Sequence, residues 1–317
     1  MKSFSELYNE FNNNSEILQA SDEAVRESKK QKKLCLWLCL IIDIIIIGFM
    51  YFIIFRKHFY IGMIGVFIVP IFMIDIVIFI ATYFAFSSKQ RKYIPIFKEQ
   101  IIKKLMNNFF DDLEYFPSKK MPMNIYNEPK YHGYYNRYHS DDYLEAKLDD
   151  KYLIDMAEVK TEDEETSTDS EGHTTTHTYT IFHGLFAKVI IDKSINSNLR
   201  ITSNNDGLYS NKLNMDSTVF EKKFNVYASD KIIGMQILTA DIMEEILEFR
   251  SRIDRDFDIF INENNIYLRF HCGPMFEPKL VKEGTLDEKS LKLYYNIINF
   301  ICDLSKSLIN IIDNVEI

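Results

Sequence analysis

Glycine is scarce in this sequence, at 10 of 317 residues, and there are only 7 prolines and one tryptophan. No Gly-x-Gly-x-x-Gly, Walker, Gly-x-Ser-x-Gly or His-Glu-x-x-His motif occurs. A phosphate-cradling loop is therefore not expected. The known catalytic signatures are missing as well, so enzymatic activity stays open, with the balance against it.

Cysteine is also rare, and its spacing does not suggest a metal site. Cys35 and Cys39 lie in an apolar run, while Cys272 and Cys302 stand far apart. Without a Cys-x-x-Cys pair, neither a zinc ligand set nor a redox motif is indicated. We expect reduced, mostly buried thiols in a reducing cytosol, with no metal and no cofactor.

An excess of positive charge is lacking. The chain carries 37 Lys and Arg against 46 Asp and Glu, a net charge of −9. Nucleic-acid binding by bulk charge is therefore not predicted. Hydrophobic residues make up 47% of the chain, which is enough for a folded core.

Two long apolar runs dominate the first third of the chain. One spans residues 34–55 with a single charge at Asp43, and the other spans 61–86 with a single charge at Asp75. Each exceeds the ~20 apolar residues that cross a bilayer. They predict a two-helix transmembrane hairpin over residues 34–86, after an N-terminal cytoplasmic helix over 1–33.

Basic residues flank this hairpin on its outer ends: Lys29, Lys30, Lys32 and Lys33 before it, and Lys89, Arg91 and Lys92 after it. The connecting turn holds only Arg56 and Lys57. The positive-inside rule then places both termini in the cytoplasm. The flanking bases are expected to contact anionic lipid head groups of the bilayer.

The remainder of the chain is acidic. Residues 111–317 hold 23 basic and 37 acidic residues, a net charge of −14. The acidic run Glu162–Glu165 lacks the spacing of an EF-hand loop, so we interpret it as a solvated hairpin loop. Such a domain should stand off an anionic membrane or face a basic partner.

Residues 87–317 predict one cytoplasmic α+β domain with a mainly antiparallel sheet. Helical periodicity covers 93–113, 239–251 and 286–312, with Thr239 as the N-cap of the second helix. Strands are expected at 151–159, 174–182, 184–191, 199–203, 223–228 and 231–238. Residues 254–261 and 266–272 predict a hairpin around Glu263.

Several segments of the sequence resemble those of a known protein family. The most specific are Phe220–Asp230, Leu238-Thr239 with Met243-Glu244, Phe182–Phe186, Phe276–Pro278 and Tyr138–Leu148. They resemble a bacterial family known only as the domain of unknown function number 3137. The resemblance covers most of the chain and implies an N-terminal helix, two adjacent spans and a cytoplasmic domain, in the bacterial plasma membrane. It implies no reaction and no ligand.

The two intramembrane carboxyls are the sharpest candidate site. Asp43 and Asp75 would lie roughly 14 and 17 Å from the cytoplasmic ends of their spans at ~1.5 Å per residue. At one level they could share a proton and hydrogen-bond across the helices. An ion site, or contact with another membrane protein, is the functional alternative.

A second polar group lies in the soluble part. Asp141, Asp142 and Glu145 stand near Tyr138 and Tyr143. They could form a polar pocket, but a surface turn is the simpler interpretation.

These patterns favour a membrane-anchored, non-enzymatic interaction protein that presents an acidic domain to a protein partner. The alternative is a small oligomeric transporter or channel component that uses Asp43 and Asp75. Two spans are too few to enclose a pore, so that alternative requires a homo-oligomer.

Overall fold

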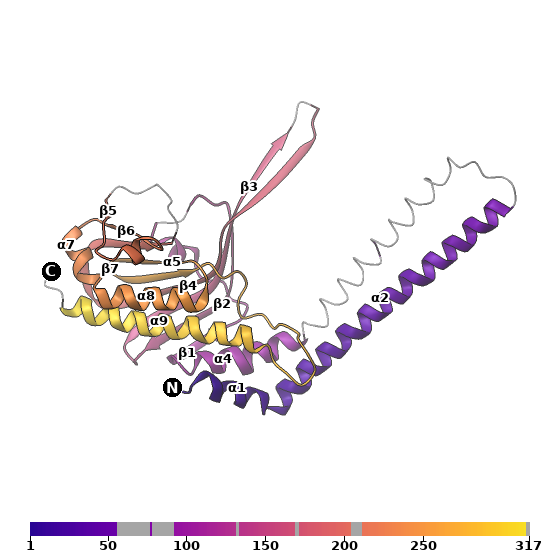
Figure 1. Cartoon of the computed structure of the whole chain (residues 1–317), viewed down its shortest axis with the longest axis horizontal. Coiled ribbons are helices and arrows are strands. Elements are labelled where there is room, and N and C mark those ends of the chain that lie inside the picture. The colour runs from indigo at the N-terminus through magenta and orange to yellow at the C-terminus, as the bar shows by residue number, and fades with distance from the viewer. Residues whose placement is uncertain (56–76, 78–91, 131–132, 169–170, 204–210, 315–317) are drawn as a thin grey trace. The chain divides into compact units, whose positions relative to one another are not determined.

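The computed structural model describes residues 1–55, 77, 92–130, 133–168, 171–203 and 211–314 (Figure 1). The chain divides into two compact units. The first comprises Met1–Phe4, Ile102–Glu277 and Lys289–Ile317, and the second comprises Ser5–Ile101 and Pro278–Glu288.

The second unit is built on two consecutive helices, α1 (Phe4–Asn12) and α2 (Ser15–Phe55). Asn14 separates them, and its Oδ1 accepts hydrogen bonds from the amides of Glu16 and Ile17 at 3.0 and 3.3 Å. The expected N-terminal helix is therefore present but interrupted, because asparagine bonds the free amides that begin the next helix. Helix α2 continues without a break from the basic segment into the first apolar run.

Short elements lead from the second unit into the first. Residues 92–97 are helical and are followed by the π-helix η2 (Lys98–Ile102) and by α4 (Lys103–Met106). Strand β1 begins at Asp111. The helix expected over 93–113 is thus shorter and partly of π type.

The first unit contains a seven-stranded sheet, which confirms the predicted α+β class with an antiparallel sheet. The path runs β1-β2-β3-β4-β6-β5, with β7 also paired to β4, and every pair is antiparallel. The strands are β1 (Asp111–Phe116), β2 (Arg137–Leu148), β3 (Tyr152–Thr168), β4 (Thr174–Thr202), β5 (Lys212–Leu213), β6 (Asn225–Ala228) and β7 (Phe257–Phe270).

Helices α8 (Ala240–Ile253) and α9 (Glu288–Asn314) lie across one face of the sheet (Figure 1). Phe249 of α8 stacks on Phe300 of α9 with ring centroids 3.5 Å apart, and both rings contact Phe257 of β7. Burying aromatic rings of this size contributes much of the core stability. Both helices agree with the predicted segments, and Thr239 caps α8 as expected.

The opposite face carries a smaller apolar cluster. It includes Phe186 of β4, Phe260 and Tyr267 of β7, and Tyr126 of the short helix α5 (Met123–Asn127). The side chains of adjacent strand residues point to opposite faces. Phe260 therefore belongs to this face, while its neighbours Ile259 and Ile261 belong to the helix-covered one.

One of two local predictions was wrong. Residues Lys231–Ile237 form helix α7 rather than a strand, because Oδ1 of Asp230 accepts the amides of Ile232 and Ile233 and starts the helix. The predicted hairpin around Glu263 is confirmed, since β7 (Phe257–Phe270) folds back on itself: the amide of His271 donates to the carbonyl of Asp256 at 2.9 Å, and the rings of Phe257 and Phe270 lie 5.6 Å apart. Glu263 adopts a positive φ of 46° at the turn, and the two halves of β7 pair with separate segments of β4, residues 185–190 and 199–202.

We expect Asp230→Ala to destabilise the first unit by about 1 kcal/mol, since α7 loses its N-terminal cap. The thermal unfolding midpoint of the full-length protein in mild detergent measures the effect. Asp230→Asn is the matched control, because asparagine caps nearly as well. An equal loss in both variants would mean that the negative charge matters and the cap does not.

Candidate functional site

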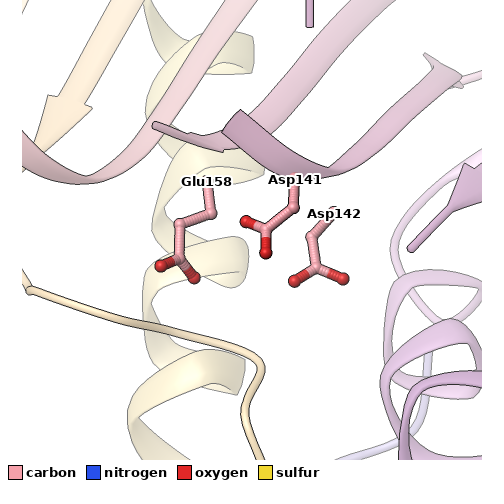
Figure 2. A group of neighbouring side chains, drawn as sticks. All are labelled: Asp141, Asp142 and Glu158. Carbon is pink, nitrogen blue, oxygen red and sulfur yellow. The ribbon is translucent and has the colours of Figure 1, made fainter. Parts of the chain in front are cut away.

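Three carboxylates from neighbouring strands come together in the first unit. Asp141 and Asp142 of β2 and Glu158 of β3 each offer an oxygen, and these oxygens lie within 4.8 Å of one another (Figure 2). Asp142 is 1% exposed and Glu158 is 7% exposed. Like charges this close oppose joint ionisation, so the group will retain protons or hold a cation.

A bulge in β2 produces this arrangement. The β2–β3 register shifts between Asp141 and Leu144, and Asp142 has a φ of 51°. The bulge turns the Asp142 carboxylate inward, where it accepts a hydrogen bond from the hydroxyl of Tyr115 on β1. Burial and the Asp142 charge together raise the pKa of Tyr115, so this hydroxyl stays a donor.

Glu158 is held by two further contacts. Its Oε2 accepts the amide of Met275 at 2.7 Å, and its Oε1 lies 3.2 Å from Nε2 of His183. Burial, reinforced by the charges of Asp141, Asp142 and Glu277, raises the pKa of Glu158 to about 8 against the opposing Met275 hydrogen bond. Burial, followed by the charge of Lys160, lowers the pKa of His183.

The chemistry of the cluster follows from these shifts. Near neutral pH a protonated Glu158 can donate to a neutral His183, and the pair can exchange a proton. When fully deprotonated, the cluster offers three oxygens of the kind preferred by Ca²⁺ and Mg²⁺. The proton on Glu158 competes with any such cation until the pH rises above about 8.

A second buried polar group lies on the opposite face of the sheet. Asp258 of β7 is 1% exposed, and its Oδ2 accepts from Nη2 and Nε of Arg269 at 2.6 and 2.9 Å. Its Oδ1 accepts from the hydroxyl of Thr202 at 2.7 Å, and Nε2 of His271 lies 3.1 Å from Oδ2. Burial acts to raise the pKa of Asp258, but Arg269, His271 and Thr202 outweigh it and keep that pKa well below its usual range.

A third feature is the hairpin arm, residues 163–180, formed by the ends of β3 and β4. These strands stay paired out to Thr168 and Thr174 and project from the rest of the sheet (Figure 1). On one side β2 ends its pairing at Arg137 opposite Glu162, with Arg137 and Asn136 also reaching Glu164. On the other side, the pairing of β4 with β7 begins only at Leu185.

The arm is exposed and acidic. In the described part of the chain, neither of its edges has a neighbouring strand beyond Glu164, and its residues are exposed from Glu165 onward. Its sequence contains five acidic residues and no Lys or Arg. The predicted solvated hairpin is therefore found here, but Glu162–Glu165 belong to a strand and not to the loop.

Of the two aspartates predicted to lie within the membrane, one is among the described residues. Asp43 lies on α2 and is partly exposed, whereas Asp75 lies outside the described residues. The pairing of these two residues, and the transport alternative built on it, stay predictions.

Some of the basic residues predicted to contact lipid are described in the structure, and others are not. Among those on α2, Nζ of Lys29 forms an ion pair with Glu283 at 2.9 Å, and Nζ of Lys30 pairs with Glu27 at 3.5 Å. Lys32, Lys33 and Lys92 are exposed, and Lys89 and Arg91 lie outside the described residues. Over the described part of the chain, no helix meets the length and apolarity expected of a membrane span.

Sequence reasoning found part of the buried polar chemistry. It singled out Asp141 and Asp142, but a surface turn is the wrong interpretation, because Asp142 is buried in a strand. Glu158, Asp258 and Arg269 were missed. A charged residue within a hydrophobic strand was the available signal, since buried charges need partners.

Comparison with known proteins supports one part of the expected resemblance. A family model described as "Protein of unknown function (DUF3137)" matches residues 180–309. The segments Phe182–Phe186, Phe220–Asp230 and Phe276–Pro278 lie inside this match, and Tyr138–Leu148 lies outside it. This part of the chain is therefore similar to that family.

Two other comparisons add little. No curated protein matches the chain. Among solved structures, the mycobacterial trehalose monomycolate transport factor A, TtfA, aligns with a TM-score of 0.34 and 7% identity. That alignment covers 62% of this chain and 88% of TtfA, and its low score supports no conclusion.

Proposed function

We propose that this protein is a membrane-anchored, non-enzymatic interaction protein whose cytoplasmic domain binds a basic segment of a protein partner through the hairpin arm. The observation that carries the proposal is the arm itself, an exposed two-stranded projection with five acidic residues and no Lys or Arg. An isolated two-stranded hairpin is marginally stable in water, so an arm of this length favours a role in binding.

The edges of the arm define the mode of binding. Unpaired strand edges present amide and carbonyl groups that can accept an additional strand. The acidic side chains disfavour self-association of arms by charge repulsion. The same charges favour a Lys- or Arg-rich extended segment, which would add main-chain hydrogen bonds and charge complementarity together.

The membrane anchor rests on the apolar runs and on helix α2. Between residues 34 and 51, α2 exposes large apolar side chains, including Leu36 at 65%, Trp37 at 57% and Ile44 at 66%. An exposed apolar surface of this kind requires a covering medium. We assign that medium to the bilayer, with residues 34–55 and 61–86 as its two spans and both termini in the cytoplasm.

Site-specific crosslinking tests the proposal. In one full-length variant, the photocrosslinker p-benzoylphenylalanine replaces Tyr179 on the arm, a residue that is 54% exposed. In the control variant it replaces Val219 on α6 (Thr218–Glu221), which is 60% exposed. After irradiation in native membranes, we expect the arm position alone to yield one adduct with a second protein. Mass spectrometry should place the crosslink in a Lys- or Arg-rich segment.

Arm variants provide the matched controls. Replacing residues 165–177 by Asn-Gly shortens the hairpin at the Glu164–Thr178 pair while keeping a two-residue turn. We expect the shortened variant not to bind the partner. The double variant Glu165→Gln with Glu171→Gln should bind it only at low salt. Equal recovery of the same partner by the shortened protein would refute the arm as the binding element.

A further inference from the structure

The face of the sheet opposite α8 and α9 contains a cavity of about 600 Å³. Its described lining comes from β4, β6, β7 and the segment after α5, together with Asn211 before β5 and Ser229 after β6, all in the first unit. It is separate from the carboxylate cluster and from the hairpin arm. A volume of this size lies within the usual range for small-molecule sites.

The floor of the cavity is a cross-strand row of three side chains. Arg200 of β4 is directly opposite Tyr227 of β6 on one side and Phe260 of β7 on the other. Directly opposed residues of antiparallel strands project from the same face with Cβ atoms about 5 Å apart. Arg200 is 4% exposed, so the floor places a buried guanidinium between two aromatic rings.

The other lining groups are mostly polar and neutral. Four amide side chains contribute, those of Asn198, Asn211, Asn262 and Asn265, together with the hydroxyl of Ser229. Oδ1 of Asn262 is buried without a hydrogen-bond partner in the described structure. An acceptor in this state costs free energy unless a ligand donates to it.

The lining acids do not make the cavity negative. The carboxylate of Glu128 is already matched by Nζ of Lys188 at 2.5 Å and by the hydroxyl of Tyr267 at 3.0 Å. Lys130 and Glu263 are exposed at the rim and are opposite in sign. The guanidinium of Arg200 is a buried cation of the described lining, and its several planar N–H donors suit a planar or tetrahedral anion.

We infer that this cavity binds a small hydroxylated organic anion of the sugar-phosphate class. The anionic group faces Arg200, and the amides exchange hydrogen bonds with hydroxyl groups because each amide both donates and accepts. The rings of Tyr227, Phe260 and Tyr267 contact the apolar C–H face of the sugar. A purely apolar ligand would leave the amides without partners.

Calorimetric titration of the full-length protein in mild detergent tests this assignment. The probes are glucose 6-phosphate, glucose and inorganic phosphate. We expect glucose 6-phosphate to bind at least about tenfold more tightly than either of the other two. Equal binding of phosphate alone or of glucose alone overturns the assignment, and so does absence of glucose 6-phosphate binding up to about 10 mM.

Variants locate the binding in the cavity. Arg200→Lys keeps the charge but loses the planar fork, and we expect at least a tenfold loss of affinity. Since Arg200 is buried, Asn198→Ala provides a second variant at an exposed lining residue, with an expected loss of about threefold to tenfold. Lys222→Ala, outside the lining, should bind as the wild type does. Unchanged affinity in both lining variants would mean that the ligand binds elsewhere and would refute this cavity as the binding site.

The shortened-arm protein separates this inference from the proposed function. It should bind glucose 6-phosphate as the wild type does, since the cavity and the arm share no described residue. Loss of sugar-phosphate binding in that variant would contradict the assignment to the cavity.

Discussion

Arg269→Met is expected to destabilise the protein by about 3–5 kcal/mol, because it leaves a buried carboxylate without its counter-charge. Asp258 is 1% exposed and receives two hydrogen bonds from Arg269, at 2.6 and 2.9 Å. Methionine fills a similar volume but supplies neither the charge nor the donors. Chemical unfolding of the full-length protein in detergent, followed by circular dichroism, measures the loss.

The double variant Asp258→Asn with Arg269→Met provides the control. Removing both charges should recover part of the lost stability, because the uncompensated ion is then gone. If the double variant proves no more stable than Arg269→Met, lost packing rather than an unpaired charge explains the effect.

The same pair has a defined dependence on pH. Arg269 helps to hold the pKa of Asp258 below its usual range, so the ion pair stabilises the wild type above that range and less as the pH falls through the lowered pKa. In Arg269→Met the carboxylate is buried without the guanidinium, and acid should then stabilise the fold relative to neutral pH. The ratio of variant to wild-type stability should therefore increase as the pH is lowered.

Glu158→Gln should reduce the loss of unfolding free energy that the wild type shows on going to alkaline pH. The reduction should reach up to a few kcal/mol, because a pKa change of one unit corresponds to about 1.4 kcal/mol. The folded-state pKa of Glu158 is raised to about 8 from 4.5. Between these values the folded state retains a proton that the unfolded state releases, so wild-type stability falls as the pH rises from about 4.5 to about 8 and then levels off. Glutamine resembles the protonated acid and keeps an acceptor for the amide of Met275.

Thermal unfolding of both proteins at pH 5.5 and at pH 8.5, in the same detergent, measures the difference. Glu114→Gln is the matched control, since Glu114 is exposed on β1 and its carboxylate is solvated. Identical pH profiles for Glu158→Gln and the wild type would contradict a proton held at Glu158.

Periodicity predicted the helices that have one long apolar face. Helices α8 and α9 follow the predicted ranges closely, because their faces are buried against the sheet over many turns. Thr239 also caps α8 as its position in the sequence suggested. Strand content was predicted in general, since β-branched and aromatic residues dominate the segments that pair.

The turn at Glu263–Asn265 was predictable from its composition, and β7 folds back there as expected. The short helix α7 was harder to predict. Ile232 and Ile233 favour strands, but the side chain of Asp230 and the contacts of Gly234 at the sheet decide for a helix. In α7 the cap and the tertiary contacts together outweigh the local strand preference.

The sequence by itself determined the α+β class, the two apolar runs with Asp43 and Asp75, and the distribution of charge, because these depend on composition and periodicity alone. Only the tertiary structure decided which charges are buried together. Asp142 and Glu158 meet through a bulge, Asp258 and Arg269 meet across the two halves of the β7 hairpin, and Arg200 is placed between Tyr227 and Phe260 by strand register. Register and bulges arise from pairing between distant segments, and a shift of one residue would send each of these side chains to the other face.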